Sequence, residues 1–317
     1  MWTVVTSRGC VPNLAVEEIR ALLGREENVW IDLSDPGEAA YRLLSETLHF
    51  HPLTIEDIQH GHQRPKVEEY DGYRFAVLFL ARWHDHQLDF GDVYVYLTPR
   101  VVVTVHQGAE PSLDALKDRA SQHQTEIARR PGFLSYLVVD AIVDELFPVL
   151  DQLDDLIDDV EDQVASRATT TDLTDLTRLK HDVVDLRRRL GAQRDLFQRL
   201  LMAEATGPEN ELSPYFRDVY DHVVRQYEIV DSLRDVLSGA LDIYLSTVSN
   251  RLNITVKQLT VIASLFLPLS FLTGFFGMNF TFLTDRIQTP LSFFLALLLM
   301  AGAMALQLYV LRWRGWL

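Results

Sequence analysis

The chain has 317 residues, of which 48% are hydrophobic, and a formal net charge of −16 at pH 7. This length and apolar content are enough for two or three domains with buried cores. So acidic a chain is not typical of nucleic-acid-binding proteins, and we expect no nucleic-acid partner.

The charge is unevenly distributed along the chain. Residues 251–317 contain five basic residues and one acidic residue, a net charge of +4, so residues 1–250 carry −20. The single cysteine, Cys10, cannot form a disulfide within the chain, which favours a reducing compartment. The N-terminal sequence has no basic start followed by a long apolar run, so we expect the N-terminus to stay in the cytosol.

The first 130 residues contain the strand signals. Runs rich in β-branched and aromatic residues predict strands at 3–6, 29–33, 73–83, 93–98 and 101–106. Helices are predicted at 13–24 and 35–48, and Asp35 is expected to cap the second, with Pro36 in its first turn. We therefore predict a cytosolic α/β domain over 1–130.

Residues 131–257 are predicted to form a cytosolic helical domain. Apolar residues recur at three- and four-residue steps from Ile142 to Val164, which predicts an amphipathic helix. Its polar face carries ten acidic residues and no basic residue between Asp140 and Asp162. Such a face is either simply solvated or holds cations near a pore mouth. A second helix, at 172–201, is basic on its exposed side and is expected to pack beside the first.

The longest predicted helix follows a break in this pattern. Ser213 and Pro214 predict a sharp helix start. An apolar stripe then continues without a turn residue, at Val219, Val223, Val230, Leu233, Leu237, Leu241, Leu245, Val248, Leu252 and Leu259. It predicts a single stalk helix of about 64 residues over 215–278. Such a helix is not stable alone, so we expect several copies of the chain to associate around a shared axis.

Two segments are long and apolar enough to cross a bilayer, at about 258–278 and 289–311. The flanks away from the connecting loop carry basic residues, namely Arg251, Lys257, Arg312 and Arg314. An excess of Lys and Arg marks the cytosolic side, so both termini of this multi-pass inner-membrane protein are expected in the cytosol. We predict a transmembrane hairpin over 258–317, which either forms a transport path or merely anchors the body.

Two kinds of chemistry are not expected from the sequence. Neither the phosphate-binding pattern G-x-x-x-x-G-K-[ST] nor the dinucleotide pattern G-x-G-x-x-G occurs, so we expect no ATP-driven pump, enzyme or organic cofactor. Histidines gather in two stretches, at His49, His51, His60 and His62 and at His84 and His86. Zinc ligation is one interpretation, but without cysteines or helical i, i+4 spacing we prefer surface histidines.

The sequence "FLTGFFGMNF", which ends the first apolar segment, the second segment after it and the final "RWRGWL" together resemble the CorA family of divalent-cation transporters. The resemblance extends through "YLSTVSNRLNITVKQLTVIASLFLPLSF" and upstream through "HPLTIEDIQHGHQRPKVEEYDGYRFAVL" and "FRDVYDH". ZntB-like zinc transporters look like the nearest branch. The resemblance implies an α+β membrane protein that assembles as a funnel-shaped homopentamer, with the first membrane helices lining the pore.

The resemblance also implies the site residues of the pore. Gly277, Met278 and Asn279 would form the selectivity filter, in which a ring of Asn279 carboxamides binds a hydrated ion. The pore-lining positions of the family fall on Asn253, Val256, Leu259, Leu267 and Ser270. A neutral ring suits Mg²⁺, which gives up its water reluctantly, and apolar rings are able to close by dewetting.

Asp218, in "FRDVYDH", matches a family acid that binds a regulatory cation between subunits. Its partner would be Asp85, Asp89 or Asp92 of a neighbouring chain, and we take Asp89 as the expected ligand. A cation bound there would clamp the funnel shut, so that a replete cell closes its own channel.

The expected function is uptake of Mg²⁺, and also of Co²⁺ or Ni²⁺, down the electrochemical gradient, with the cations as both substrate and regulator. CorA magnesium channels commonly carry an acidic "MPEL" after the Asn, whereas this loop offers only Asp285. A ZntB-like zinc transporter, with or without proton coupling, is therefore the alternative. A membrane-anchored coiled-coil scaffold without transport activity is a second alternative.

Overall fold

The computed structural model describes residues 2–25, 27–84, 87–167, 170–206, 212–285 and 289–316. The chain divides into two compact units, Met1–Leu241 and Asp242–Leu317. The predicted division at 130 and 257 stays a prediction.

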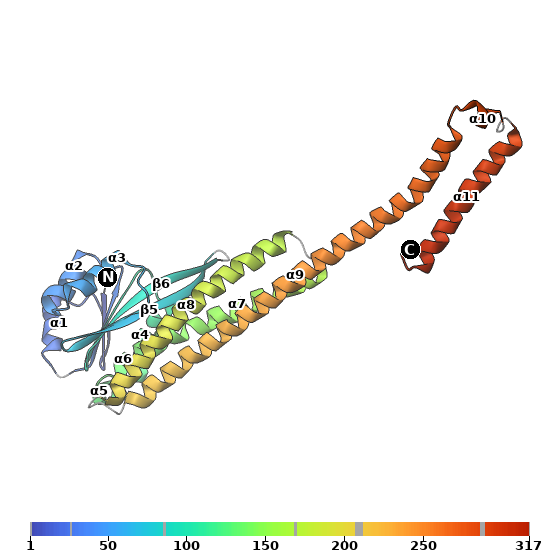
Figure 1. Ribbon diagram of the computed structural model, residues 1–317. Coiled ribbons are helices and arrows are strands. Elements are labelled where there is room, and N and C mark those ends of the chain that lie inside the picture. The colour runs from blue at the N-terminus through green and yellow to red at the C-terminus, as the bar shows by residue number, and fades with distance from the viewer. Residues whose placement is uncertain are drawn as a thin grey trace. The chain divides into compact units, whose positions relative to one another are not determined.

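The first unit contains a sheet that includes β5 and β6 (Figure 1). The sheet has seven strands in the order β2-β1-β3-β7-β6-β5-β4. The strands are β1 (Trp2–Thr6), β2 (Gly9–Pro12), β3 (Val29–Ser34), β4 (Lys66–Tyr70), β5 (Tyr73–His84), β6 (Gln87–Leu97) and β7 (Val101–His106). All neighbouring strands are antiparallel except β3 and β7, which are parallel. The five predicted strands are confirmed, and the hairpin between β6 and β7 turns at Pro99. The sequence did not predict the two short edge strands β2 and β4.

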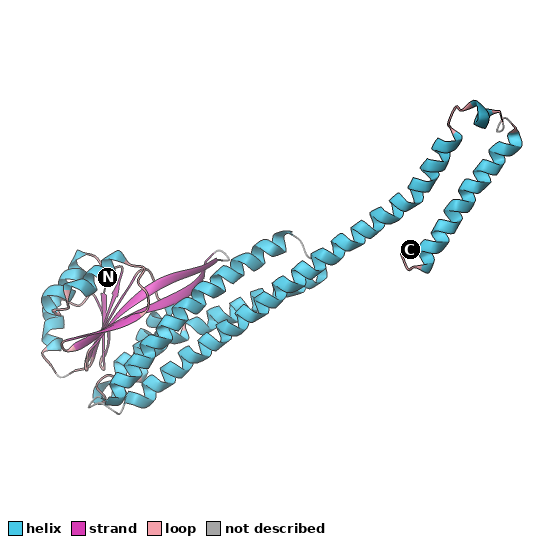
Figure 2. Cartoon of the chain, in the orientation of Figure 1, coloured by secondary structure: helices cyan, strands magenta, loops and turns pink. Residues whose placement is uncertain are grey.

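Helices cover both faces of the sheet, as the secondary-structure colouring also shows (Figure 2). The short helices are α1 (Val16–Leu23), α2 (Glu38–Arg42), η1 (Leu43–Thr47), α3 (Pro52–His60), α4 (Pro111–Arg119), η2 (Ala120–Gln122) and α5 (Gln124–Arg129). The longer ones are α6 (Phe133–Asp144), α7 (Leu146–Arg167), α8 (Thr170–Thr206) and α9 (Ser213–Phe276). Strand alternation sends Ile31 and Leu33 into the core under α1–α3, while Trp30 and Asp32 lie on the opposite face.

A buried polar network ties that opposite face together. Asp32 accepts a hydrogen bond from the Thr104 hydroxyl at 2.5 Å and lies 3.2 Å from His106 Nε2 and 2.6 Å from Lys117 Nζ. Burial alone would raise the pKa of the Asp32 carboxyl, but the imidazole and the ammonium outweigh burial and hold that pKa below its usual value. The network joins β3, β7 and α4.

Two predicted helix boundaries are wrong. Asp35 does not cap a helix. Its backbone is left-handed, with φ 47°, and its carboxylate accepts from the Gly108 N–H at 2.7 Å, while α2 begins at Glu38 after Gly37. The acidic helix is also not continuous, because α6 ends at Asp144 and α7 begins at Leu146. Pro148 has no N–H to donate to the Asp144 carbonyl, four residues earlier, which explains the break.

The second unit contains the end of α9, the short helix α10 (Thr281–Thr284) and α11 (Pro290–Trp313). α9 has 64 residues and begins at Ser213, which confirms the single long helix predicted from the apolar stripe. The Thr289 side chain caps α11 by accepting from the Ser292 N–H. Both α9 and α11 are long and apolar enough to cross a membrane.

Candidate functional site

The motif Gly277-Met278-Asn279 lies directly after the end of α9. The Gly277 N–H donates to the Thr273 carbonyl at 2.9 Å, and the Met278 N–H donates to the Phe275 carbonyl at 3.3 Å. These bonds close the last turn. Asn279 follows outside the helix with an exposed side chain, and among the described residues its carboxamide has no hydrogen-bond partner.

Gly277 is needed at this turn for a steric reason. A Cβ added there would lie 3.1 Å from the Thr273 carbonyl oxygen and 3.6 Å from the Gly274 carbonyl oxygen. Only the Thr273 oxygen lies closer than ordinary van der Waals contact, and because it is a backbone atom of the last helical turn, that turn would have to shift by a few tenths of an ångström. A side chain at 277 would therefore displace the segment that carries Asn279.

The predicted pore-lining residues share one exposed face of α9. Leu267, Leu259 and Val256 are 73%, 67% and 53% exposed, and Asn253 and Ser270 are exposed as well. At about 100° per residue the five positions fall within an arc of about 120°. This face is continuous along the segment.

The opposite face of α9 packs against α11. The more buried positions of α9 there are Val261, Ser264, Leu265, Pro268, Leu269, Leu272 and Phe276, and those of α11 are Ser292, Ala296, Met300, Ala303, Gln307 and Leu311. Gln307 Nε2 donates to the Ser264 carbonyl at 2.5 Å, and Lys257 Nζ donates to the Gly315 carbonyl at 3.0 Å. The centre of this face is about 150° around the helix from the centre of the predicted pore face. The pore face therefore points away from α11 and is available to another partner.

A second group of polar side chains lies in the first unit, where α6 packs against α9. Asp140 and Asp144 are one turn apart on α6, and Asp218 and His222 are one turn apart on α9. His222 Nδ1 lies 2.8 Å from Asp144 Oδ1, and His222 Nε2 lies 4.0 Å from Asp218 Oδ1. Possible ligand atoms of Asp140, Asp144 and His222 all lie within 4.8 Å of one another. We call these four residues the α6–α9 cluster.

The two helices are held together around this cluster by specific contacts. Gln226, which is fully buried on α9, donates Nε2 to the Val143 carbonyl of α6 at 2.7 Å. Nearer the start of α9, the ring of Tyr215 packs edge-on against Phe133 of α6, at 5.6 Å between ring centroids. These contacts fix the register that brings the two i, i+4 pairs together.

The electrostatics of the cluster favour a bound cation. Burial, followed by the Asp144 carboxylate, raises the pKa of Asp140 to about 6. Oδ1 of Asp140 is buried and has no hydrogen-bond partner among the described atoms. Asp140 and Asp144 also line a cavity of about 500 Å³. Two carboxylates and one imidazole form a set of ligands suited to a divalent transition metal.

The structure leaves the predicted partner of Asp218 undecided. Asp218 lies beside His222 of its own chain, and whether it also meets an acid of a neighbouring chain stays a prediction. Asp89 is exposed and lines a cavity of about 550 Å³ together with the half-buried Asp92. Burial raises the pKa of Asp92, whose carboxylate accepts from the Gln63 N–H at 3.0 Å. Asp85 lies outside the described residues.

The histidine-rich stretches do not assemble a metal site within the part of the chain that the structure describes. The only triad of metal-ligating side chains found there is the one with Asp140, Asp144 and His222. His51 instead caps α3, its Nδ1 accepting from the Leu53 N–H at 3.2 Å. His86 lies outside the described residues.

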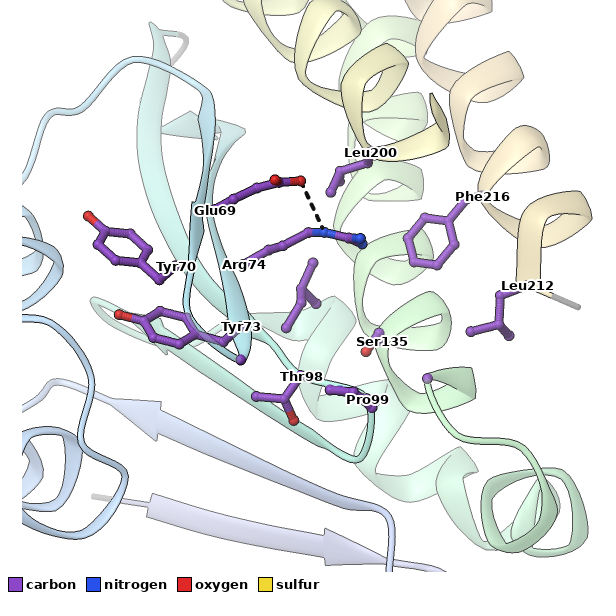
Figure 3. A pocket seen from close by; sticks show the side chains of 13 residues that line it. Glu69, Tyr70, Tyr73, Arg74, Thr98, Pro99, Ser135, Leu200, Leu212 and Phe216 are labelled. Atoms are coloured by element: carbon purple, nitrogen blue, oxygen red, sulfur yellow. Dashed lines mark ion pairs between the residues drawn. The ribbon is translucent and has the colours of Figure 1, made fainter. Parts of the chain in front are cut away.

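A further cavity, of about 380 Å³, opens between the β4–β5 hairpin and the helices α6, α8 and α9 (Figure 3). Its single acid, Glu69, pairs with Arg74 at 3.6 Å. Tyr70, Tyr73 and Phe216 supply aromatic surface. A cavity with one acid already paired is poorly suited to a cation, so we assign it no part in transport.

The sequence did not predict the α6–α9 cluster. In the sequence Asp140 is one of the ten acidic residues of a long acidic face, and His222 lies in "FRDVYDH" with no metal-ligand spacing of its own. The signal was present in the two i, i+4 pairs. The two pairs come together only because α6 packs against α9, and His222 and Asp144 are 78 residues apart in the sequence. The periodicity of each helix does not predict which other helix it contacts.

Comparisons with known proteins agree on one family. Residues 25–312 match the family model described as CorA-like Mg²⁺ transporter protein. The chain is 34% identical over 290 residues to the putative metal ion transporter YfjQ of Bacillus subtilis, covering 90% of this chain and 89% of that protein. It is 32% identical over 274 residues to the cobalt/magnesium transport protein CorA of Thermotoga maritima, covering 85% of this chain and 78% of that protein.

Solved structures confirm the predicted fold. The complete CorA magnesium transporter from Methanocaldococcus jannaschii superposes with a TM-score of 0.84 at 22% identity, covering 100% of this chain and 99% of that one. The cytoplasmic domain of ZntB from Vibrio parahaemolyticus also shares the fold, with a TM-score of 0.59 at 10% identity over 70% of this chain and 88% of that one. YfjQ and CorA are thus nearer to the chain than ZntB, and the expectation that ZntB is the nearest branch is wrong.

Proposed function

The chain belongs to the family of CorA-like Mg²⁺ transporter proteins, and from this membership we propose that it conducts divalent cations, Mg²⁺ and also Co²⁺ or Ni²⁺, into the cell. It is a membrane protein with two C-terminal transmembrane helices, and the family consists of transporters rather than enzymes. The proposed assembly is a homopentamer in the inner membrane. Five copies place the α9 helices around a common axis.

The observation that carries this proposal is the exposed face of α9. Asn253, Val256, Leu259, Leu267 and Ser270 point away from α11, so they are available to line a path shared by several copies. The stripe just before them is also exposed in the single chain. Leu245 and Leu252 are 57% and 62% exposed, which is a large apolar surface for a polar environment. Neighbouring copies of α9 would cover it.

Selectivity is assigned to Asn279. Mg²⁺ loses its water reluctantly, so a ring of neutral carboxamides that accept hydrogen bonds from its hydration shell binds the ion without stripping it. The exposed carboxamide after the last turn of α9, which has no hydrogen-bond partner among the described residues, suits this role. Gly277 supports it by letting the turn close.

The proposed orientation places both termini in the cytosol. The contact of Lys257 Nζ with the Gly315 carbonyl brings the two basic flanks of the hairpin to the same end. An excess of Lys and Arg at one end marks the cytosolic side. A divalent cation entering a negative cell then gains about 4.6 kcal/mol per 100 mV, so uptake needs no other fuel.

We assign regulation by intracellular cation to the α6–α9 cluster. A cation held by Asp140, Asp144 and His222, with Asp218 beside them, would neutralise acids that repel one another. A cation bound there favours one packing of α6 on α9, and α9 is the helix that continues to the predicted pore. Occupancy at high internal concentration would hold the channel closed.

The proposal is tested by uptake into proteoliposomes that contain a Mg²⁺- or Zn²⁺-sensitive dye. We expect wild-type protein to carry Mg²⁺ and Co²⁺, and Asn279→Ala to lose most of that flux. Asn250→Ala is a control, because Asn250 is an exposed asparagine on α9 that lies off the predicted pore face. Equal flux in wild type and Asn279→Ala contradicts the assignment of selectivity. Zinc flux that follows a pH gradient would favour a ZntB-like zinc transporter instead.

A further inference from the structure

Pro268 interrupts the backbone hydrogen bonding of α9 inside the apolar segment. A proline has no N–H, and in a helix that N–H would bond the carbonyl four residues earlier. The carbonyl freed by Pro268 is that of Ser264. It lies about 9 Å inside the apolar run that begins at 258.

Gln307 of α11 donates its amide to this same carbonyl, with 2.5 Å between Nε2 and the oxygen. Gln307 is half-buried and faces α9. It is also the one amide side chain in the sequence of α11. The Ser264 hydroxyl is engaged elsewhere, donating to the Val261 carbonyl at 3.0 Å, so the acceptor for Gln307 is the backbone.

Each of the two groups would be costly by itself in hydrocarbon. No water is present there to bond an unpaired carbonyl or an unpaired amide. A polar side chain in a membrane helix is therefore expected to have a specific partner. Here the partner is the carbonyl that proline has left open, which explains both the amide in α11 and the tolerance of Pro268 in α9.

The position of this bond gives it a consequence for the pore face. Leu267 immediately precedes Pro268, and Ser270 follows it by two residues. Both are exposed on the face of α9 opposite α11. A change in the bend at Pro268 would move these two side chains relative to the rest of that face, because proline bends a helix at the freed carbonyl.

We propose that Gln307 is a positioning residue of the transport path. Its amide fixes the bend of α9 at Pro268 and so holds Leu267 and Ser270 in place. The bond between the two helices is independent of what the protein carries, while the consequence for flux rests on the proposed transport function.

The decisive test is a double-mutant cycle in the full-length protein. Gln307→Met is nearly isosteric but cannot donate, and Pro268→Ala restores an N–H that can bond the Ser264 carbonyl within the helix. We expect Gln307→Met to lower Mg²⁺ flux in proteoliposomes by about threefold to twentyfold, the range given by one hydrogen bond in a membrane protein. In the Pro268→Ala background the same change should alter flux by less than about twofold. An equal loss in both backgrounds would mean that Gln307 only packs, and would overturn the proposal.

Two controls separate the backbone acceptor from general packing. Ser264→Ala keeps the carbonyl and should leave flux unchanged. Leu306→Met alters an exposed neighbour of Gln307, 65% exposed, and should also be neutral. A loss with Ser264→Ala as large as that with Gln307→Met would assign the effect to the hydroxyl and contradict the proposal.

Two further readouts do not require flux, so a failure of the proposed function would remain distinguishable. The thermal midpoint of the detergent-solubilised protein should fall with Gln307→Met only when Pro268 is present, even if no cation is carried. The positioning role is read from the rate at which a water-soluble thiol reagent modifies Ser270→Cys in a Cys10→Ser background. We expect Gln307→Met to lower this rate at least about threefold. An unchanged rate would overturn the positioning role.

Discussion

Replacing Asp140 by Asn is expected to change the stability of the protein in two ways that depend on divalent cation. Without cation, the substitution removes a carboxylate that burial and Asp144 make unfavourable. With cation, it removes a ligand of the α6–α9 cluster. Asp140→Asn should therefore stabilise the protein in EDTA and abolish most of the stabilisation that a cation gives to the wild type.

The size of the first effect follows from the pKa. The pKa of Asp140 rises from 3.8 to about 6, which corresponds to about 3 kcal/mol at 1.36 kcal/mol per unit. The side chain is partly open to solvent, and screening reduces this to about 1–2 kcal/mol. For a unit of this size that is about 3–6 °C in the thermal midpoint.

The sign of the pH dependence is also fixed. The folded-state pKa of Asp140 lies above its unfolded value. Ionisation of Asp140 therefore does not lower the stability of the wild type below pH 3.8, and it lowers that stability by the full amount above about pH 6. The advantage of Asp140→Asn in EDTA should be largest at pH 7.5 and fade as the pH falls from 6 to 4.

The assay is thermal denaturation of the full chain in detergent, in EDTA and with Co²⁺ or Mg²⁺. A cation at 100 times its Kd stabilises the wild type by about 2.7 kcal/mol, or about 5–10 °C. Co²⁺ should act at lower concentration than Mg²⁺, because imidazole prefers the transition metal. Asp221→Asn is the matched control, since Asp221 is exposed beside His222 on the same helix. If cations shift wild type and Asp140→Asn equally, the cluster does not bind them.

Other parts of the molecule give three further predictions. Gly277→Ala should lower selective flux in proteoliposomes while leaving the size of the assembly unchanged, because its Cβ would lie 3.1 Å from the Thr273 carbonyl oxygen and shift the turn before Asn279; normal flux would contradict this. Leu267→Ser should raise the resting flux severalfold, because a ring of serine hydroxyls would keep the narrow part of the pore hydrated. An unchanged resting flux would argue against an apolar gate at Leu267. Burial raises the pKa of Glu110 to about 7 despite the Arg82 guanidinium, so stability should fall by up to about 3 kcal/mol as the pH rises from 4.5 to 7. Glu110→Gln should flatten that slope in denaturation experiments, and an unchanged slope would assign it to other groups.

Regular periodicity predicted the large elements well. The apolar stripe from Val219 onward predicted one helix over 215–278, and α9 spans Ser213–Phe276. The prediction succeeded because apolar residues at helical spacing, with no turn residue among them, indicate one continuous helix. The strands β5 and β7 were equally clear, since runs rich in aromatic and β-branched residues predict buried strands. Short edge strands such as β4, Lys66–Tyr70, carry too few apolar residues to be recognised.

Local signals failed where a distant residue decided the outcome. Aspartate is a residue type that often caps helices, and Asp35 precedes a predicted helix. Its carboxylate instead accepts a hydrogen bond from the N–H of Gly108, which is 73 residues away. The α6–α9 cluster likewise depends on tertiary packing. The pore residues were predicted from a family resemblance, and the structure adds the exposure of Leu267 and its neighbours. Their roles in the pore stay predictions.

The central claim is that the exposed face of α9 meets the same face of other copies around a shared path. Intermolecular disulfide formation tests it most directly, in a Cys10→Ser background reconstituted into bilayers. We predict covalent dimers with Leu267→Cys and none with Leu298→Cys, although the two leucines are 73% and 71% exposed in the single chain. Cross-linking through Leu298→Cys but not Leu267→Cys would place α11 at the interface between copies and contradict the account.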